Sequence, residues 1–205
     1  MRRTGHIPWF GIFLAVVTLA FETATHFRPG LYPSLQRHFA LSWDSLEEFQ
    51  FHRILLSAFI QTSAGYSTTI FGLTSVIVPG YEFREGTRRA LTLFFLGDWL
   101  STLSVLVVLK VAGDLGNGTA ARLASEPDSG SSAGGFACLG ALILGLPPRY
   151  RLVAIAALAG FFAVRFTFWH RLFDFQHALA SLVGMALWAA LEYRQTRARP
   201  AKVPS

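Results

Sequence analysis

The sequence has a single cysteine, Cys138, among its 205 residues, and only 15% of the chain is charged. One cysteine excludes an intramolecular disulfide framework and a cluster of thiolate metal ligands. With 52% hydrophobic residues and a mean hydropathy of +0.42, the chain is too apolar for an ordinary soluble domain of this size. The shortage of charge therefore favours a membrane protein, in which we expect Cys138 to be a small packing residue.

Long apolar runs recur along most of the chain. A helix needs about 20 apolar residues to cross a bilayer. The sequence predicts six such helices, at residues 9–24, 62–81, 90–111, 132–146, 152–168 and 175–191. Arg2 and Arg3 precede the first run as in a signal peptide, but Glu22, His26 and the lack of a small-residue cleavage site favour a retained helix.

The basic residues, which give a net charge of +6, lie between the apolar runs rather than on one surface. This distribution argues against a nucleic-acid partner. Arginines gather at residues 2–3, 84–89, 149–151 and 194–199, which are alternate loops, so the positive-inside rule predicts that both termini are cytoplasmic. We expect a multi-pass protein of a bacterial plasma membrane, with a membrane domain at residues 1–193 and a disordered basic tail at 194–205. The chain has neither inverted repeats nor paired half-helices, which disfavours a transporter.

Serines and glycines crowd the start of the fourth run, in DSGSSAGGFACLGAL at residues 128–142. The predicted topology places Ser132 and His177 at similar depths near the outer ends of their helices. A serine and a histidine at one depth form a candidate nucleophile and base. The alternative is that the serines cap the helix or allow close helix packing. An ionisable side chain within the membrane, such as His177, points to function.

Two short motifs lie at the starts of the fourth and sixth runs. GSSAGGFACLGA at residues 130–141 resembles the GxSG motif of rhomboid intramembrane serine proteases, with Ser132 in the position of the nucleophile. QHALASLVG at residues 176–184 resembles the AHxxG motif, with His177 in the position of the base. The resemblance places two further residues, Gly130 and Phe136, at the oxyanion or substrate cavity, and it gives Gly140 and Gly184 structural roles.

The resemblance extends over nearly the whole chain. HRILLSAFIQTSAGY, from residue 52, looks like the Trp-Arg opening and second helix of rhomboids, with Arg53 in the arginine position. The same register brings Glu82 and Gly86 onto the family's glutamate and glycine. Residues 27–51 are amphipathic, as in a segment that lies in the membrane interface. The resemblance implies an all-α membrane protein, a rhomboid-like bundle of six transmembrane helices with a long membrane-associated loop between helices 1 and 2.

The family implies a function as well. Rhomboids cleave single-pass membrane proteins near the outer end of the transmembrane segment, which here would use Ser132 as the nucleophile and His177 as the base. No metal and no other cofactor is implied, and the partners are the transmembrane substrate and the lipid bilayer. The alternative is a catalytically inactive rhomboid-like protein that binds the transmembrane helices of client proteins.

The sequence departs from the family in the oxyanion hole. Rhomboids use the backbone N–H of the serine together with a histidine and an asparagine on the second helix, whereas Tyr66 and Ile70 occupy those positions here and Gln61 replaces an upstream histidine. Isoleucine cannot donate a hydrogen bond, although Tyr66 and Gln61 can. Loss of one donor weakens transition-state stabilisation by about 2.7–4 kcal/mol. Ala133 also replaces the last glycine of GxSG and adds a methyl group beside the nucleophile.

Other polar residues of the apolar runs have structural interpretations. We expect Asp98 to be a hydrogen-bonded packing residue of the third helix. Glu22 and His26 share a helix face, but two ligands are too few for a defined metal site, so we expect an interfacial polar pair. Arg165 is expected to extend toward the membrane surface.

Overall fold

The computed structural model describes residues 7–61, 72–168 and 172–198, and in these ranges the chain is α-helical, with no β-strand. The expectation of an all-α protein is therefore confirmed for this part of the chain. The described α-helices are α1 (Trp9–Phe27), α2 (Leu31–Phe39), α3 (Trp43–Glu47), α4 (His52–Leu56), α6 (Val78–Glu85), α7 (Thr87–Asp114), α8 (Gly118–Ser125), α9 (Ser132–Leu144), α10 (Pro148–Phe168) and α11 (Leu172–Ala198). Two short turns accompany them, a 3₁₀ turn η1 (Ser57–Phe59) and a π-helical turn η2 (Leu73–Ile77).

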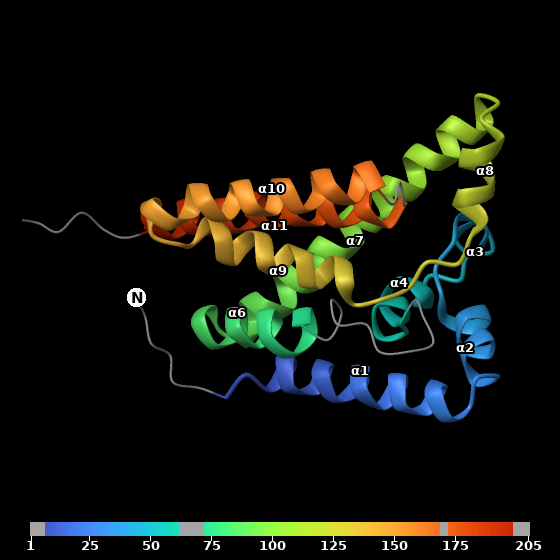
Figure 1. Ribbon diagram of the computed structural model, residues 1–205, viewed down its shortest axis with the longest axis horizontal. Coiled ribbons are helices and arrows are strands. Elements are labelled where there is room, and N and C mark those ends of the chain that lie inside the picture. Colours follow the sequence, from blue (N-terminus) through green and yellow to red (C-terminus); the bar gives the residue numbers. More distant parts are fainter. Residues whose placement is uncertain (1–6, 62–71, 169–171, 199–205) are drawn as a thin grey trace, which may run out of the picture.

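The short helix α9 lies at the centre of the bundle. Nine of its 13 residues are buried, because small side chains let neighbouring helices pack on all of its sides. Its main neighbours are α11 and α7, and α6 also contacts it. In Figure 1, α9, α10 and α11 lie side by side, α7 crosses behind them, and α1 and α6 lie on the opposite side of α9.

Three of the described helices, α1, α7 and α10, are long and apolar enough to cross a membrane, and α9 is a shorter apolar helix. Helix α11 has 27 residues, but Asp174, Gln176 and His177 interrupt the apolar sequence near its start. The three long apolar helices thus support the general prediction of a protein with membrane-spanning helices. The finer prediction of six spans stays a prediction, and part of the second run, residues 62–71, lies outside the described residues.

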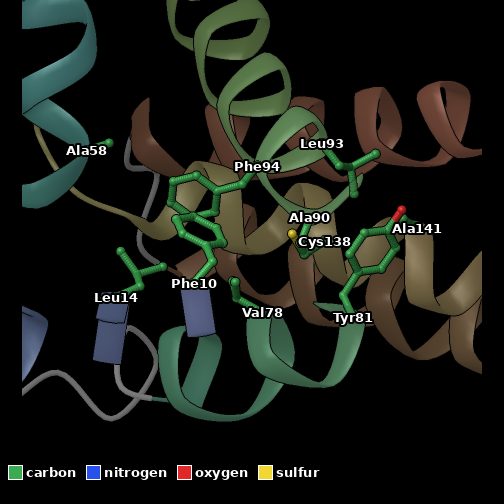
Figure 2. Close-up of a cluster of buried hydrophobic side chains, with 10 residues drawn as sticks. All are labelled: Phe10, Leu14, Ala58, Val78, Tyr81, Ala90, Leu93, Phe94, Cys138 and Ala141. Atoms are coloured by element: carbon green, nitrogen blue, oxygen red, sulfur yellow. The ribbon is translucent and has the colours of Figure 1, made fainter. Parts of the chain in front are cut away.

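The largest apolar core joins α1, η1, α6, α7 and α9 (Figure 2). Phe10 and Phe94 meet edge to face at its centre, with ring centroids 5.3 Å apart. Cys138 is a free thiol, fully buried in the same core. Burial of this kind fits the packing role expected for Cys138 from the sequence.

Helices α2, α3, α4 and α8 gather at the end of the bundle opposite to the start of α1 (Figure 1). The expected amphipathic segment at residues 27–51 thus contains the short helices α2 and α3. Ser42 caps α3, because its hydroxyl accepts a hydrogen bond from the Ser45 backbone N–H. Asn117 caps α8 through the N–H of Ala120.

Three residues that the motif resemblance singled out make contacts between separate segments of the fold. The buried carboxylate of Glu82 accepts hydrogen bonds from the backbone N–H of Phe10 at 3.1 Å and of Gly11 at 2.7 Å. Gly86, between α6 and α7, has φ +94°, a conformation that favours glycine. Arg53 donates to the carbonyl of Ala40 at 2.8 Å. These contacts anchor the start of α1, the turn into α7 and the segment after α2.

Several helices begin or end at other residues than expected; α7, for example, covers Thr87–Asp114 rather than residues 90–111. Helix α9 ends at Leu144 rather than at residue 146, and Arg84 donates to the Gly145 carbonyl just beyond it at 2.6 Å. Helix α11 continues to Ala198, so residues 194–198 of the expected disordered tail are helical.

Candidate active site

Ser132 and His177 lie in direct contact, although they belong to different helices and are 45 residues apart. The Ser132 Oγ is 2.8 Å from the His177 Nε2. Ser132 is the first residue of α9, and His177 lies in the second turn of α11. Both side chains are half-buried. The structure therefore brings together the two residues that the sequence singled out as nucleophile and base.

The neighbouring serines have other partners. Ser129 accepts a hydrogen bond from the Gln36 Nε2 at 2.7 Å. The Ser131 hydroxyl lies 3.4 Å from the Gln61 amide. Farther along α11, Ser181 donates to the His177 carbonyl at 3.0 Å. Of these serines, Ser132 is the one whose hydroxyl faces the imidazole.

Gly130 shapes the approach of the chain to Ser132. Its φ of +132° lies in a region that side chains with a β-carbon rarely adopt. Its backbone N–H donates to the Ser57 carbonyl at 2.9 Å. A glycine at this point lets the chain turn into α9 while it stays bound to η1.

Close packing of α9 against α11 sets the depth of the two residues. Gly140 lies so near α11 that a β-carbon would be 2.1 Å from the Ser181 carbonyl oxygen. Real β-carbons do not approach an oxygen so closely, so only glycine fits between these backbones. Gly184 makes a similar contact from the other helix. Gly140 and Gly184 are therefore both packing residues of the α9–α11 crossing.

Phe136 forms one wall of the site, one turn after Ser132. Its ring stacks on the His177 imidazole, with the centroids 4.7 Å apart and the planes inclined by 25°. The ring of Phe162, from α10, also packs against Phe136, with the two centroids 5.5 Å apart. Stacking restricts the rotation of the imidazole and keeps Nε2 directed at Ser132.

The candidate oxyanion residues are only partly described. Gln61 is fully buried, and its amide lies against the hydroxyl of Ser131, the residue before Ser132. Its main-chain carbonyl accepts from Gln36 at 2.9 Å. Tyr66 and Ile70 lie outside the described residues. The structure thus brings Gln61 to the edge of the site and leaves the role of Tyr66 as a prediction.

Three polar contacts next to the site were not predicted from the sequence. Gln176, the neighbour of His177, donates to Asp128 and Thr102. Arg165, which we expected to extend toward the membrane surface, donates from Nε to the buried Asp174 at 2.6 Å. The two opposite charges lie on neighbouring helices, α10 and α11, and form a charge-assisted hydrogen bond. The sequence did contain a sign of these contacts, because the polar residues Asp174 and Gln176 lie within one helical turn of His177.

Asp128 lies four residues before Ser132, outside the helices. Burial raises its pKa from 3.8 to about 6, while hydrogen bonds from Gln176 and from the Ser129 backbone N–H act in the opposite direction. The carboxylate of Asp98, on α7, interacts with it electrostatically and faces the backbone N–H of Gly134 in the first turn of α9. Asp98 is therefore the buried hydrogen-bonded residue that the sequence predicted.

No metal centre accompanies these groups in residues 7–61, 72–168 and 172–198, where no set of three or more His, Cys, Asp and Glu side chains is placed to hold an ion. The Glu22 and His26 pair gains no third ligand there. No family model matches the chain, and neither a curated protein nor a solved structure does. The geometry of the site is therefore the main ground on which a function can be proposed.

Proposed function

We propose that this chain is an intramembrane serine endopeptidase of the rhomboid type, which cleaves single-pass membrane proteins near the outer end of their transmembrane segments. The observation that carries the proposal is the 2.8 Å contact between the Ser132 Oγ and the His177 Nε2. A distance in this range allows a serine hydroxyl to pass its proton to an imidazole. The motif resemblance of both residues points in the same direction.

The reaction uses the two side chains in turn. With the imidazole proton on Nδ1, the Ser132 hydroxyl donates to Nε2. As Oγ bonds to the substrate carbonyl carbon, Nε2 takes the hydroxyl proton, and the resulting imidazolium gives it to the leaving amine when the C–N bond breaks. Water then attacks the acyl-enzyme, passes a proton to His177 and releases Ser132.

The start of α9 supplies donors for the oxyanion. The first N–H groups of a helix lack carbonyl partners within the helix and carry a partial positive charge. In α9 the N–H of Gly135 is bound to the Ser131 carbonyl at 3.0 Å, and Gly134 faces Asp98. We assign the oxyanion to the N–H groups of Ser132 and Ala133, which lie nearest to the nucleophile.

The proposed membrane arrangement has six spans: α1, the helix that includes η2 and α6, then α7, α9, α10 and α11. Three apolar helices support it, as does the arginine distribution. Helix α1 begins, and α11 ends, at one end of the bundle (Figure 1), which fits two cytoplasmic termini. The dyad then lies toward the outer surface, where water and a substrate bond can reach it.

One observation favours a second candidate, a catalytically inactive protein that binds client transmembrane helices. The Gln61 amide, which replaces a family histidine, is engaged with Ser131. If that engagement persists in the complex with substrate, Gln61 cannot donate to the oxyanion, which then depends on backbone donors among the described residues. The Ser132–His177 contact would then serve client binding alone.

Labelling with a fluorophosphonate probe separates the two candidates. Purified protein in detergent is treated with the probe, and the adduct is located by mass spectrometry. The protease proposal expects an adduct on Ser132 that Ser132→Ala abolishes and His177→Ala reduces by at least a hundredfold, following the general-base contribution of about 10²–10⁴.

Ser129→Ala is the matched control, because Ser129 is a buried serine that is bonded to Gln36 rather than to His177. Its labelling should equal that of the wild type. A wild-type protein that acquires no Ser132 adduct and does not cleave a single-span substrate refutes the protease and leaves the client-binding candidate.

A further inference from the structure

Gln176 precedes His177 on α11, and its buried amide joins three parts of the fold. Its Nε2 lies 2.6 Å from the Thr102 Oγ1 of α7 and 3.0 Å from the Asp128 Oδ2 of the segment before α9. An amide NH₂ group has two hydrogens, so it can donate to both acceptors at once. A single side chain thus ties the start of α11 to α7 and to the chain that leads into Ser132.

Asp128, which accepts one of these hydrogen bonds, is itself held in place. The backbone N–H of Asp128 donates to the Leu41 carbonyl at 2.7 Å, and the Asp128 carbonyl accepts from the Leu41 N–H at 2.8 Å. The Ser129 N–H donates to its carboxylate. Because Asp128 is fixed on both its main chain and its side chain, Gln176 binds to a rigid partner.

We propose that Gln176, Asp128 and Thr102 form a polar clasp that holds His177 within hydrogen-bond distance of Ser132, with Gln176 and Asp128 as positioning residues of the dyad. The inference rests on the proposed function. Asp128 engages the neighbour of the histidine rather than the imidazole, so it acts through Gln176. A displacement of about 1 Å between reacting groups lowers the reaction rate about a hundredfold. A clasp that prevents a displacement of this size would therefore have a measurable effect on the rate.

The surrounding charges explain why an amide, and not a carboxylate, fits at position 176. A glutamate there would face Asp128, with Asp98 of α7 also close enough to interact with Asp128. Charge repulsion would then open the clasp. The substitution Asp128→Asn would relieve the repulsion, since an asparagine amide can donate to the introduced glutamate while its carbonyl still accepts from the Ser129 N–H.

An exchange of donor and acceptor tests the clasp. The variants are Gln176→Glu, Asp128→Asn and the double variant, and the readouts at pH 7 are the rate constant for Ser132 labelling by the fluorophosphonate and the kcat and KM for a single-span substrate. The clasp expects Gln176→Glu to lower the labelling rate and kcat by about 10- to 100-fold with KM little changed. The double variant should recover most of this loss, because the hydrogen bond is restored with donor and acceptor exchanged.

Gln50→Glu is the matched control. It makes the same chemical change in the turn between α3 and α4, where Gln50 donates to the Glu48 side chain, and it should label at the wild-type rate. Labelling of Gln176→Glu at the wild-type rate, or a double variant no faster than Gln176→Glu, overturns the clasp alone. A wild-type protein without Ser132-dependent labelling overturns the protease, and the clasp with it.

Discussion

Gly184 lies directly against the main chain of Ala137: a β-carbon at position 184 would be 2.0 Å from the Ala137 carbonyl oxygen. Helices α9 and α11 therefore cross with their backbones in contact. His177 is seven residues before Gly184, which is about two helical turns, or roughly 10 Å along α11. A crossing this close to the dyad makes the spacing of the two helices a determinant of the Ser132–His177 distance.

Gly184→Ala should therefore damage both stability and labelling. The added methyl group must separate the helices, and overpacking of this kind lowers the free energy of unfolding by about 1–3 kcal/mol. We expect a lower midpoint of thermal unfolding in detergent and slower labelling of Ser132. The control is Gly160→Ala on α10, where a β-carbon has no neighbour within 4 Å. A Gly184→Ala protein as stable as Gly160→Ala would contradict the close crossing.

Substitution of Phe136 separates stacking from packing. Phe136→Leu retains apolar volume but removes the ring that lies on His177, whereas Phe136→Ala also leaves a cavity. Loss of the stack, about 0.5–1.5 kcal/mol, should slow Ser132 labelling about two- to tenfold in both variants. Only the alanine variant should lose about 3–5 kcal/mol of stability. Labelling of Phe136→Leu at the wild-type rate would show that the ring does not orient the imidazole.

Glu82→Ala should loosen α1 from the rest of the bundle. The substitution leaves the N–H groups of Phe10 and Gly11 without their acceptor, and each unsatisfied buried group destabilises by about 1–3 kcal/mol. The midpoint of thermal unfolding in detergent should fall by several degrees. Glu126→Ala, at an exposed residue paired with Arg122, serves for comparison and should leave the midpoint within about one degree, because exposed ion pairs contribute little.

Stability should depend on pH through Asp128. The pKa of its carboxyl rises from 3.8 to about 6 because it is buried, so the folded state holds this proton more tightly than the unfolded state. The stabilising contribution is complete below about pH 4 and is lost as the pH rises toward 6, a fall of at most about 3 kcal/mol.

Asp128→Asn carries no titratable group at this position and should lack this fall. Unfolding midpoints measured from pH 4 to 7, as the difference between the wild type and the variant, test the prediction. Two parallel pH profiles would mean that Asp128 titrates alike in the folded and unfolded states.

The sequence allowed the dyad to be predicted more fully than its surroundings. Ser132 and His177 could be predicted because short motifs and apolar runs are recognised from residues that are close together in the sequence. The partners of Gln176 and Arg165 do not, because these side chains meet Asp128 and Asp174 only after the helices have packed. The same limit applies to the end of α11, which continues to Ala198 although we expected a disordered tail from residue 194. Tyr66, in residues that the structure does not describe, keeps its predicted role without a test.

The backbone pair between Leu41 and Asp128 has a consequence for the order in which the chain is made. The chain is synthesised from its N-terminus and a domain folds as a unit, so the α2–α3 connection leaves the ribosome before the segment that leads to Ser132. The pair between Leu41 and Asp128, and with it the surroundings of the dyad, can form only after that later segment has emerged. A fragment that begins at α7 would carry both Ser132 and His177, yet it would lack the surface on which they are aligned.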